Sequence, residues 1–193
     1  MKIINHIKAG ASVAPAFSII LYYLFVALDI YTTSLASPDL RYEGNLVIRY
    51  FNLNWSQIII LGSLIVLFIT LGLLIALNFI HKYYQENIKY NHSFIVEVFH
   101  KRKLLISFII ICCFFAHLFY SIFVTISNYL QYIYLFKIEN ALTKISTCYV
   151  NKVIMIYPHI FTWVYTFFIF AALFVAAYKV KKIRNKYRKL SVV

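Results

Sequence analysis

Residues 58–80 read IIILGSLIVLFITLGLLIALNFI, an apolar run without a charged side chain. A helix of roughly 20 such residues, rising about 1.5 Å per residue, crosses a hydrocarbon core about 30 Å thick. Three further blocks are long and apolar enough, at 11–30, 104–125 and 153–178. None alternates between apolar and polar residues as the strands of outer-membrane barrels do. The sequence therefore predicts four transmembrane helices.

The composition supports this interpretation. Of the 193 residues, 63% are hydrophobic and 13% are charged, whereas soluble domains have about 45–50% apolar and about 25% charged residues. Disordered chains have the opposite balance, with low hydrophobicity and high charge. No linker or internal repeat separates a second domain. We expect an all-α polytopic membrane protein, a four-transmembrane-helix bundle forming a single integral domain over residues 1–193.

The distribution of basic residues predicts the orientation. Of the 19 Lys and Arg residues, 14 lie near the N-terminus, in the 81–103 connection or in the tail 179–193. Basic residues accumulate in short loops on the cytoplasmic side, so we expect both termini in the cytoplasm and a bacterial cytoplasmic membrane as the location. The alternative is a cleaved signal peptide ending at Ser34-Leu35-Ala36, which would leave three spans and an external N-terminus.

Polar side chains recur at helical spacing in three of the spans, in the half that this orientation places outside. The third span carries His117, Ser121, Thr125 and Asn128 on one stripe. Polar groups inside a bilayer are costly and tend to face the interior of the helix bundle. We therefore expect a polar pocket open to the outside, with these ligand-binding residues: Asp29, Thr32, Thr33, Glu43, Asn45, His117, Ser121, His159 and Thr162.

The end of the first span resembles a known family. Asp29, Thr32 and Thr33 form an Asp-x-x-Thr-Thr sequence, and Glu43 and Asn45 follow. This pattern is similar to that of small four-span prokaryotic membrane proteins of unknown function, which have a Glu-x-Asn-Pro turn after the same helix end. The resemblance covers about the first third of the chain and departs at Leu46, where the family usually has proline. It implies the four-span fold and no particular activity.

Three classes of function remain open. The first is binding of a small ligand, a lipid head group or a partner helix in the polar pocket, including a role as an accessory subunit. The second is a lipid- or peptide-modifying enzyme with Asp29 or Glu43 as general base and His117 or His159 as its proton partner. The third is a channel or transporter, which the nearly apolar inner halves of the spans disfavour. No catalytic residue is assigned.

Cofactors and partners are constrained more weakly. The chain has no nucleotide-binding or familiar hydrolase motif, and we predict no cofactor, although Asp29, Glu43, His117 and His159 are residue types that could bind zinc. We expect membrane lipids as partners, no nucleic acid, and either a membrane-protein partner or a second copy. The residues expected to contact anionic lipid are Lys179, Lys181, Lys182, Arg184, Lys186, Arg188 and Lys189. Ala172 and Ala176 form a small-xxx-small pair, which favours close helix packing within the bundle.

Overall fold

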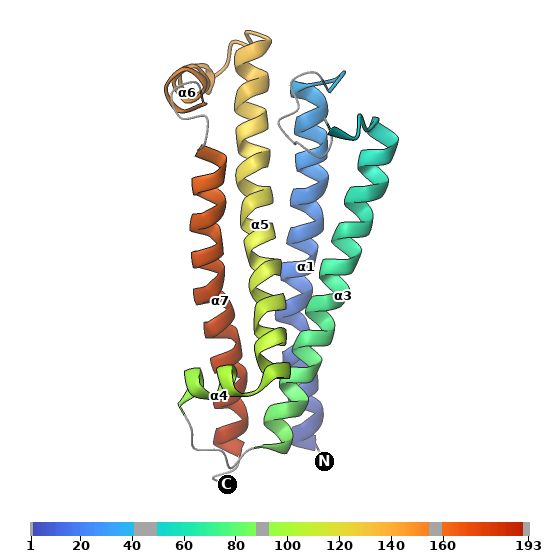
Figure 1. The fold of residues 1–193 in the computed structure, drawn as a ribbon, viewed down its shortest axis with the longest axis vertical. Helices are drawn as coiled ribbons and strands as arrows, with labels where there is room; N and C mark the ends of the chain where they lie inside the picture. Colours follow the sequence, from blue (N-terminus) through green and yellow to red (C-terminus); the bar gives the residue numbers. More distant parts are fainter. Residues whose placement is uncertain (1, 41–49, 88–92, 155–159, 191–193) are drawn as a thin grey trace. The chain divides into compact units, whose positions relative to one another are not determined.

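The structure, a computed structural model, describes residues 2–40, 50–87, 93–154 and 160–190. The described residues are mostly helical and include no strand. Figure 1 shows the helices, with their bounds as follows: α1 (Lys2–Ala36), α3 (Trp55–Glu86), α4 (Phe94–His100), α5 (Arg102–Leu135), α6 (Thr143–Cys148), the π-helical turn η1 (Tyr149–Ile154) and α7 (Ile160–Leu190). Side chains are described for residues 15–40, 50–87, 93–151 and 163–188.

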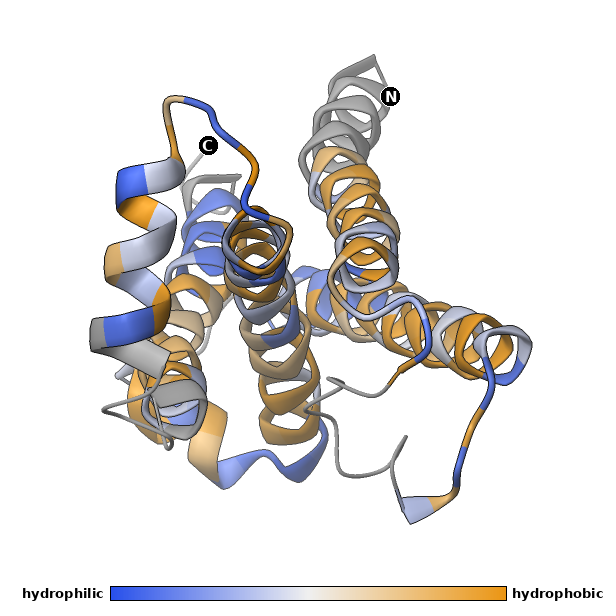
Figure 2. Ribbon diagram, turned by 90° about the horizontal axis from the view of Figure 1, so that it is seen from above, coloured by the Kyte–Doolittle hydropathy of each residue, from blue (hydrophilic) through white to orange (hydrophobic). Residues whose placement is uncertain are grey.

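Four helices are long and apolar enough to cross a membrane. The spanning segments are Pro15–Ala36, Trp55–Glu86, Arg102–Leu135 and Trp163–Arg188. Figure 2 shows hydrophobic residues along most of the length of these helices. The predicted all-α fold with four spans is confirmed, and the chain is a multi-pass helical membrane protein.

The chain divides into two compact units. The first unit comprises Met1–Val66 and Tyr120–Ile160, and the second comprises Leu67–Phe119 and Phe161–Val193. Both α3 and α5 contribute residues to each unit, so neither unit is one continuous stretch of chain.

Local sequence explains where two of the long helices end or begin. Helix α1 ends at Ala36, two residues before Pro38. Proline lacks the N–H group that would continue the helix, so Pro38 explains why α1 ends here. At the start of α3, the side chain of Asn54 accepts a hydrogen bond from the Gln57 backbone N–H at 3.0 Å. The side chain of Gln57 accepts one in return from the Asn54 N–H at 2.9 Å. This reciprocal capping box satisfies two N–H groups that a helix end leaves unpaired.

The fourth span differs from the prediction at both ends. Its expected start at residue 153 was wrong, because Tyr149–Ile154 is a π-helical turn and α7 begins at Ile160. Pro158 in the sequence just before α7 favours a helix start there rather than a helix running through. At the other end, the predicted tail from residue 179 is helical as far as Leu190. The sequence analysis also missed the short helices α4 and α6.

One face of α7 is packed within the second unit. Ala172, Ala176 and Val180 are fully buried at a spacing of four residues. Helix α5 lies against this part of α7, since the ring of Phe119 is 6.1 Å from that of Phe168 and Cys112 contacts the Ile169 carbonyl oxygen at 3.9 Å. The burial expected for the two alanines is therefore confirmed.

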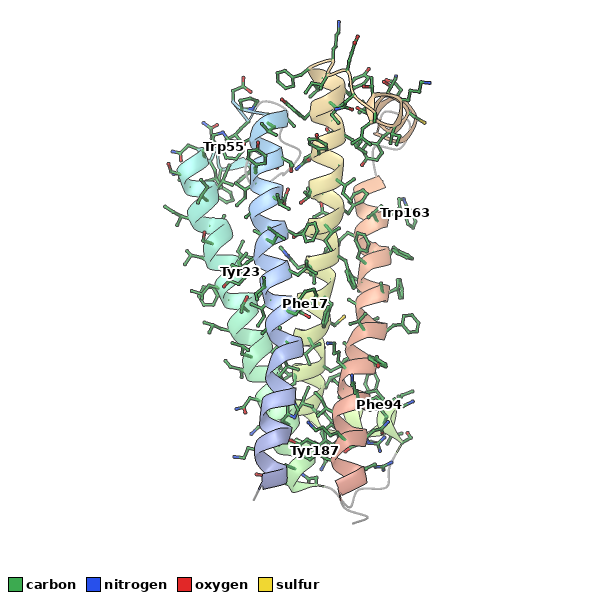
Figure 3. All side chains as sticks on the ribbon, turned by 180° about the vertical axis from the view of Figure 1, so that it is seen from behind. Phe17, Tyr23, Trp55, Phe94, Trp163 and Tyr187 are labelled. Atoms are coloured by element: carbon green, nitrogen blue, oxygen red, sulfur yellow. The ribbon has the colours of Figure 1, made fainter. Side chains whose placement is uncertain are left out.

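The opposite face of α7 carries an exposed aromatic stripe. Its members recur every three or four residues: Trp163, Phe167, Phe170, Phe174 and Tyr178. Trp163 projects away from the helix in Figure 3. Tryptophan and tyrosine at the two ends of a span, with phenylalanine between them, are typical of a helix face turned toward lipid.

Candidate functional site

The polar cluster of the first unit joins α1 to α5. The Asn128 side-chain amide on α5 donates to Asp29 Oδ1 at 3.1 Å and to Thr33 Oγ1 at 2.8 Å. The Thr33 hydroxyl in turn donates to Asp29 Oδ1 at 3.4 Å. Asp29, Thr33 and Asn128, which we call the Asp29 cluster, are all half-buried. The spacing of four residues places Asp29 and Thr33 on the same face of α1, where a single amide reaches both.

A neighbouring contact fixes the same two helices one turn away. The hydroxyl of Thr125 donates to the Ser121 carbonyl oxygen at 2.8 Å within α5 and to the Phe25 carbonyl oxygen of α1 at 3.3 Å. Thr125 precedes Asn128 by three residues, and Phe25 precedes Asp29 by four, so both contacts lie along one helix interface. Thr32, which is buried, donates to the Asp29 backbone oxygen at 3.1 Å and so contacts its own helix.

The chemistry of the Asp29 cluster is dominated by acceptors. Asn128 uses its NH₂ group toward α1, and its carbonyl oxygen accepts no hydrogen bond among the described residues. An Asn carbonyl oxygen has two lone pairs, and an ionised Asp side chain carries a negative charge. A group that brought hydrogen-bond donors, and especially a cation, would complement this arrangement.

A second hydrogen-bond network in the first unit is structural. The Tyr149 hydroxyl of η1 donates to Ser127 Oγ of α5 at 2.9 Å, and the Gln131 amide donates to the same oxygen at 3.1 Å. Burial raises the pKa of Tyr149, while its contact with Ser127 acts in the opposite direction. The hydroxyl therefore stays protonated near neutral pH and can donate. The network attaches η1 to the end of α5, as does the Tyr134 hydroxyl bound to Asn151 at 3.0 Å.

Other residues predicted for the polar pocket are distributed differently. Glu43, Asn45 and His159 lie outside the described residues, as does the side chain of Thr162. Ser121 is buried in the first unit and contributes its backbone oxygen to Thr125, whereas His117 is half-buried and belongs to the second unit. A site shared by Asp29, His117 and His159 stays a prediction.

The basic residues at the end of α7 do not share one environment. Lys181 and Lys182 are exposed, Lys186 and Arg188 are half-buried, and the side chain of Lys189 is not described. The Lys179 ammonium lies 5.9 Å from the centre of the Phe115 ring. Arg184 is buried, and its Nε lies 3.0 Å from Glu97 Oε2. The expected contact of Arg184 with lipid is thus replaced by a contact with a carboxylate of the chain itself.

Comparisons with known proteins give no further indication, since the chain matches no family model, no curated protein and no solved structure. Within the described ranges, no three His, Cys, Asp or Glu side chains are grouped so that they could hold a metal ion. Glu43 and His159, two of the four residues considered for zinc, lie outside those ranges.

Sequence analysis did not assign Asn128 to the site, although the signal was present. Asn128 lies on the same helical stripe of α5 as Ser121 and Thr125. What the sequence does not contain is the rotation of α5 about its axis and the identity of the helix that this stripe faces. In the structure, Thr125 and Asn128 both bond to α1.

Proposed function

We propose that this chain is a membrane-embedded binding protein whose Asp29 cluster takes a small polar ligand or a lipid head group. The observation that carries the proposal is the pair of hydrogen bonds from Asn128 to Asp29 and Thr33, across about a hundred residues of sequence. A half-buried carboxylate in a membrane helix is costly and marks a functional site by default. The bonds from Asn128 hold this carboxylate in one position.

The ligand class follows from the acceptors. The Asp29 carboxylate favours a positively charged group, and the Asn128 carbonyl oxygen can accept hydrogen bonds from it. A primary ammonium group, carried by an amino-lipid head group or by a small soluble amine, supplies both. A phosphate or carboxylate ligand would instead meet like charge.

The location proposed for the site follows the charge asymmetry of the sequence. With both termini in the cytoplasm of a bacterium, the Thr33 end of α1 and the Leu135 end of α5 face outward from the cytoplasmic membrane. The ligand would then enter from the external side or from the outer leaflet.

Binding fits the cluster better than catalysis does. Neither an Asn amide nor a Thr hydroxyl changes its protonation state near neutral pH, so Asn128 and Thr33 position the carboxylate without acting as its acid or base partner. A general-base mechanism would need a titrating group such as His117 or His159 beside Asp29. The contacts of Asn128 and Thr33 with Asp29 provide positioning alone.

Native mass spectrometry tests the proposal with named probes. The purified protein is offered phosphatidylethanolamine, phosphatidylglycerol or free ethanolamine, and the bound species is weighed. We expect an ethanolamine-bearing species to be retained by the wild type and lost in Asp29→Asn and Asn128→Leu, but kept in Asp39→Asn, a change in the exposed turn after α1. Retention of free ethanolamine would identify a soluble amine, and retention of the lipid alone would identify a head group.

Two results would contradict this function. Equal retention of each probe by the wild type and Asp29→Asn would mean that the Asp29 cluster does not bind a ligand. A protein that co-purifies in stoichiometric amount and is lost only in Asp29→Asn would identify a partner helix as the occupant.

A further inference from the structure

Helix α4 of the second unit exposes an apolar face. Ile95 and Phe99, one turn apart, are 66% and 67% exposed, and Val96 beside them is also exposed. The opposite face is buried through Glu97 and Val98. Figure 1 shows α4 lying crosswise to α7. A helix of this orientation that turns apolar side chains outward is unfavourable in water but suited to the boundary between head groups and acyl chains.

A seven-residue helix needs anchors, because short helices are marginal by themselves. Ser93 caps its first turn, accepting from the Val96 N–H at 3.4 Å. The Glu97 carboxylate is fixed by Arg184 of α7 at 3.0 Å, with both side chains almost completely buried. These anchors determine which face of α4 is turned outward, and that face is the one with Ile95 and Phe99.

The charges around this face are positive. Lys101, Arg102 and Lys103 follow α4 directly, and all three are exposed. Glu97, the acidic residue of α4, is buried and compensated by Arg184, so it presents no negative charge outward. Basic residues near an anionic membrane surface strengthen binding to it. An apolar strip bordered by three cations is complementary to an anionic leaflet.

We infer that α4 is an interfacial helix: Ile95 and Phe99 enter an anionic leaflet of the membrane that the chain spans, and Lys101, Arg102 and Lys103 contact its phosphates. This surface belongs to the second unit and is independent of the Asp29 cluster, so either proposal can fail without the other. Through this face of α4 the protein senses or recruits anionic lipid at the membrane surface beside α7.

Spin labels on the full-length protein in lipid nanodiscs test the inference. The native cysteines are replaced (Cys112→Ala, Cys113→Ala, Cys148→Ser), and a nitroxide is attached at Phe99→Cys, at His100→Cys as a neighbour on the same helix, or at Asn140→Cys in an exposed connection. Collisions with molecular oxygen report an apolar environment, and collisions with a neutral nickel chelate report water. Nanodiscs contain phosphatidylcholine alone or with phosphatidylglycerol.

We expect the label at 99 to be accessible to oxygen and shielded from nickel, and the label at 140 to show the reverse, with the label at 100 between them. Adding phosphatidylglycerol should deepen the label at 99, and salt at about 1 M, where the Debye length is about 3 Å, should reverse this shift. The variant with Lys101→Gln, Arg102→Gln and Lys103→Gln should lose the response to phosphatidylglycerol while its label at 140 is unchanged.

Three results would overturn the inference. Free access of nickel to the label at 99 in anionic nanodiscs would place α4 in water. Exclusion of both oxygen and nickel would mean that protein, either a second copy or another partner, covers the face. An identical depth with and without phosphatidylglycerol would remove the role of the three basic residues.

Discussion

Nε of Arg184 lies 3.0 Å from Oε2 of Glu97, and the two side chains are only 7% and 3% exposed. The contact is an ion pair without the alignment of a hydrogen bond. The second unit also contains an exposed pair for comparison, Lys82 and Glu86, with 4.0 Å between Nζ and Oε1 and exposed fractions of 71% and 60%. The two pairs differ in distance and in burial, and burial determines the consequence of removing one partner.

Glu97→Ala should lower the free energy of unfolding by about 3–5 kcal/mol, because it leaves the buried Arg184 charge uncompensated. Glu86→Ala should cost less than about 1 kcal/mol, since both of its charges are solvated. Reversible unfolding in mixed detergent micelles measures both changes. The double variant Glu97→Leu with Arg184→Met should recover most of the loss, because it removes both charges together. Equal losses for Glu97→Ala and Glu86→Ala would show that the buried pair has no special role.

The long helices were predictable because a membrane span needs only length and apolarity. The run at 58–80 lies within α3, and the other three blocks also overlap spanning helices. The short helix α4 was not predictable in this way. This seven-residue helix is held by the contact of Glu97 with Arg184, which lies more than eighty residues further along the chain. No local sequence pattern predicts that contact.

Arg184 illustrates how a charge-rich segment was misinterpreted. The seven basic residues within 179–189 were all expected to contact anionic lipid. However, Ala176, Val180 and Arg184 are spaced by four residues, and the buried face of α7 continues through this series. Helical periodicity, extended past the end of the apolar block, would have predicted an inward position for Arg184. The identity of its acidic partner would still have required the tertiary structure.

Ala176→Leu should destabilise the protein by about 1–3 kcal/mol, because a larger side chain must be forced into a filled helix contact. Phe174→Leu on the same helix should have little effect, since Phe174 is 78% exposed. Thermal unfolding of the two variants in the same detergent compares them directly. A loss of stability in Phe174→Leu as large as that in Ala176→Leu would mean that the aromatic stripe is also packed against protein.

The orientation is tested by reporters fused after Val193 and inserted at Glu43. A reporter active only in the cytoplasm should give a signal at Val193, and one active only outside should give a signal at Glu43. The reason is that most Lys and Arg residues lie in the segments assigned to the cytoplasmic side. A cytoplasmic signal at Glu43 would reverse the topology. The Asp29 cluster would then face the cytoplasm, and a ligand would have to enter from that side.

The hydrogen bond between Asp29 and Asn128 predicts the size of their coupling energy. Because Asn128 donates directly to Asp29, the single changes Asp29→Ala and Asn128→Ala should each lose the same bond. The double variant should therefore cost less than the sum of the two single changes. Hydrogen bonds between membrane helices average about 0.6 kcal/mol and reach about 1.7 kcal/mol, and we expect the coupling energy to fall within this range. Unfolding of the four proteins of the cycle in one detergent mixture gives its value.

Asp39→Ala combined with Asn128→Ala is the matched control for this cycle. Asp39 is exposed in the turn after α1, and removing its charge should add independently to the effect of Asn128→Ala. Coupling for the Asp29 pair but not for the Asp39 pair would confirm that α1 and α5 are joined through this carboxylate. Strict additivity for both pairs would show that Asp29 and Asn128 do not interact in the membrane. The positioning of the carboxylate, on which the proposed binding function depends, would then have no basis.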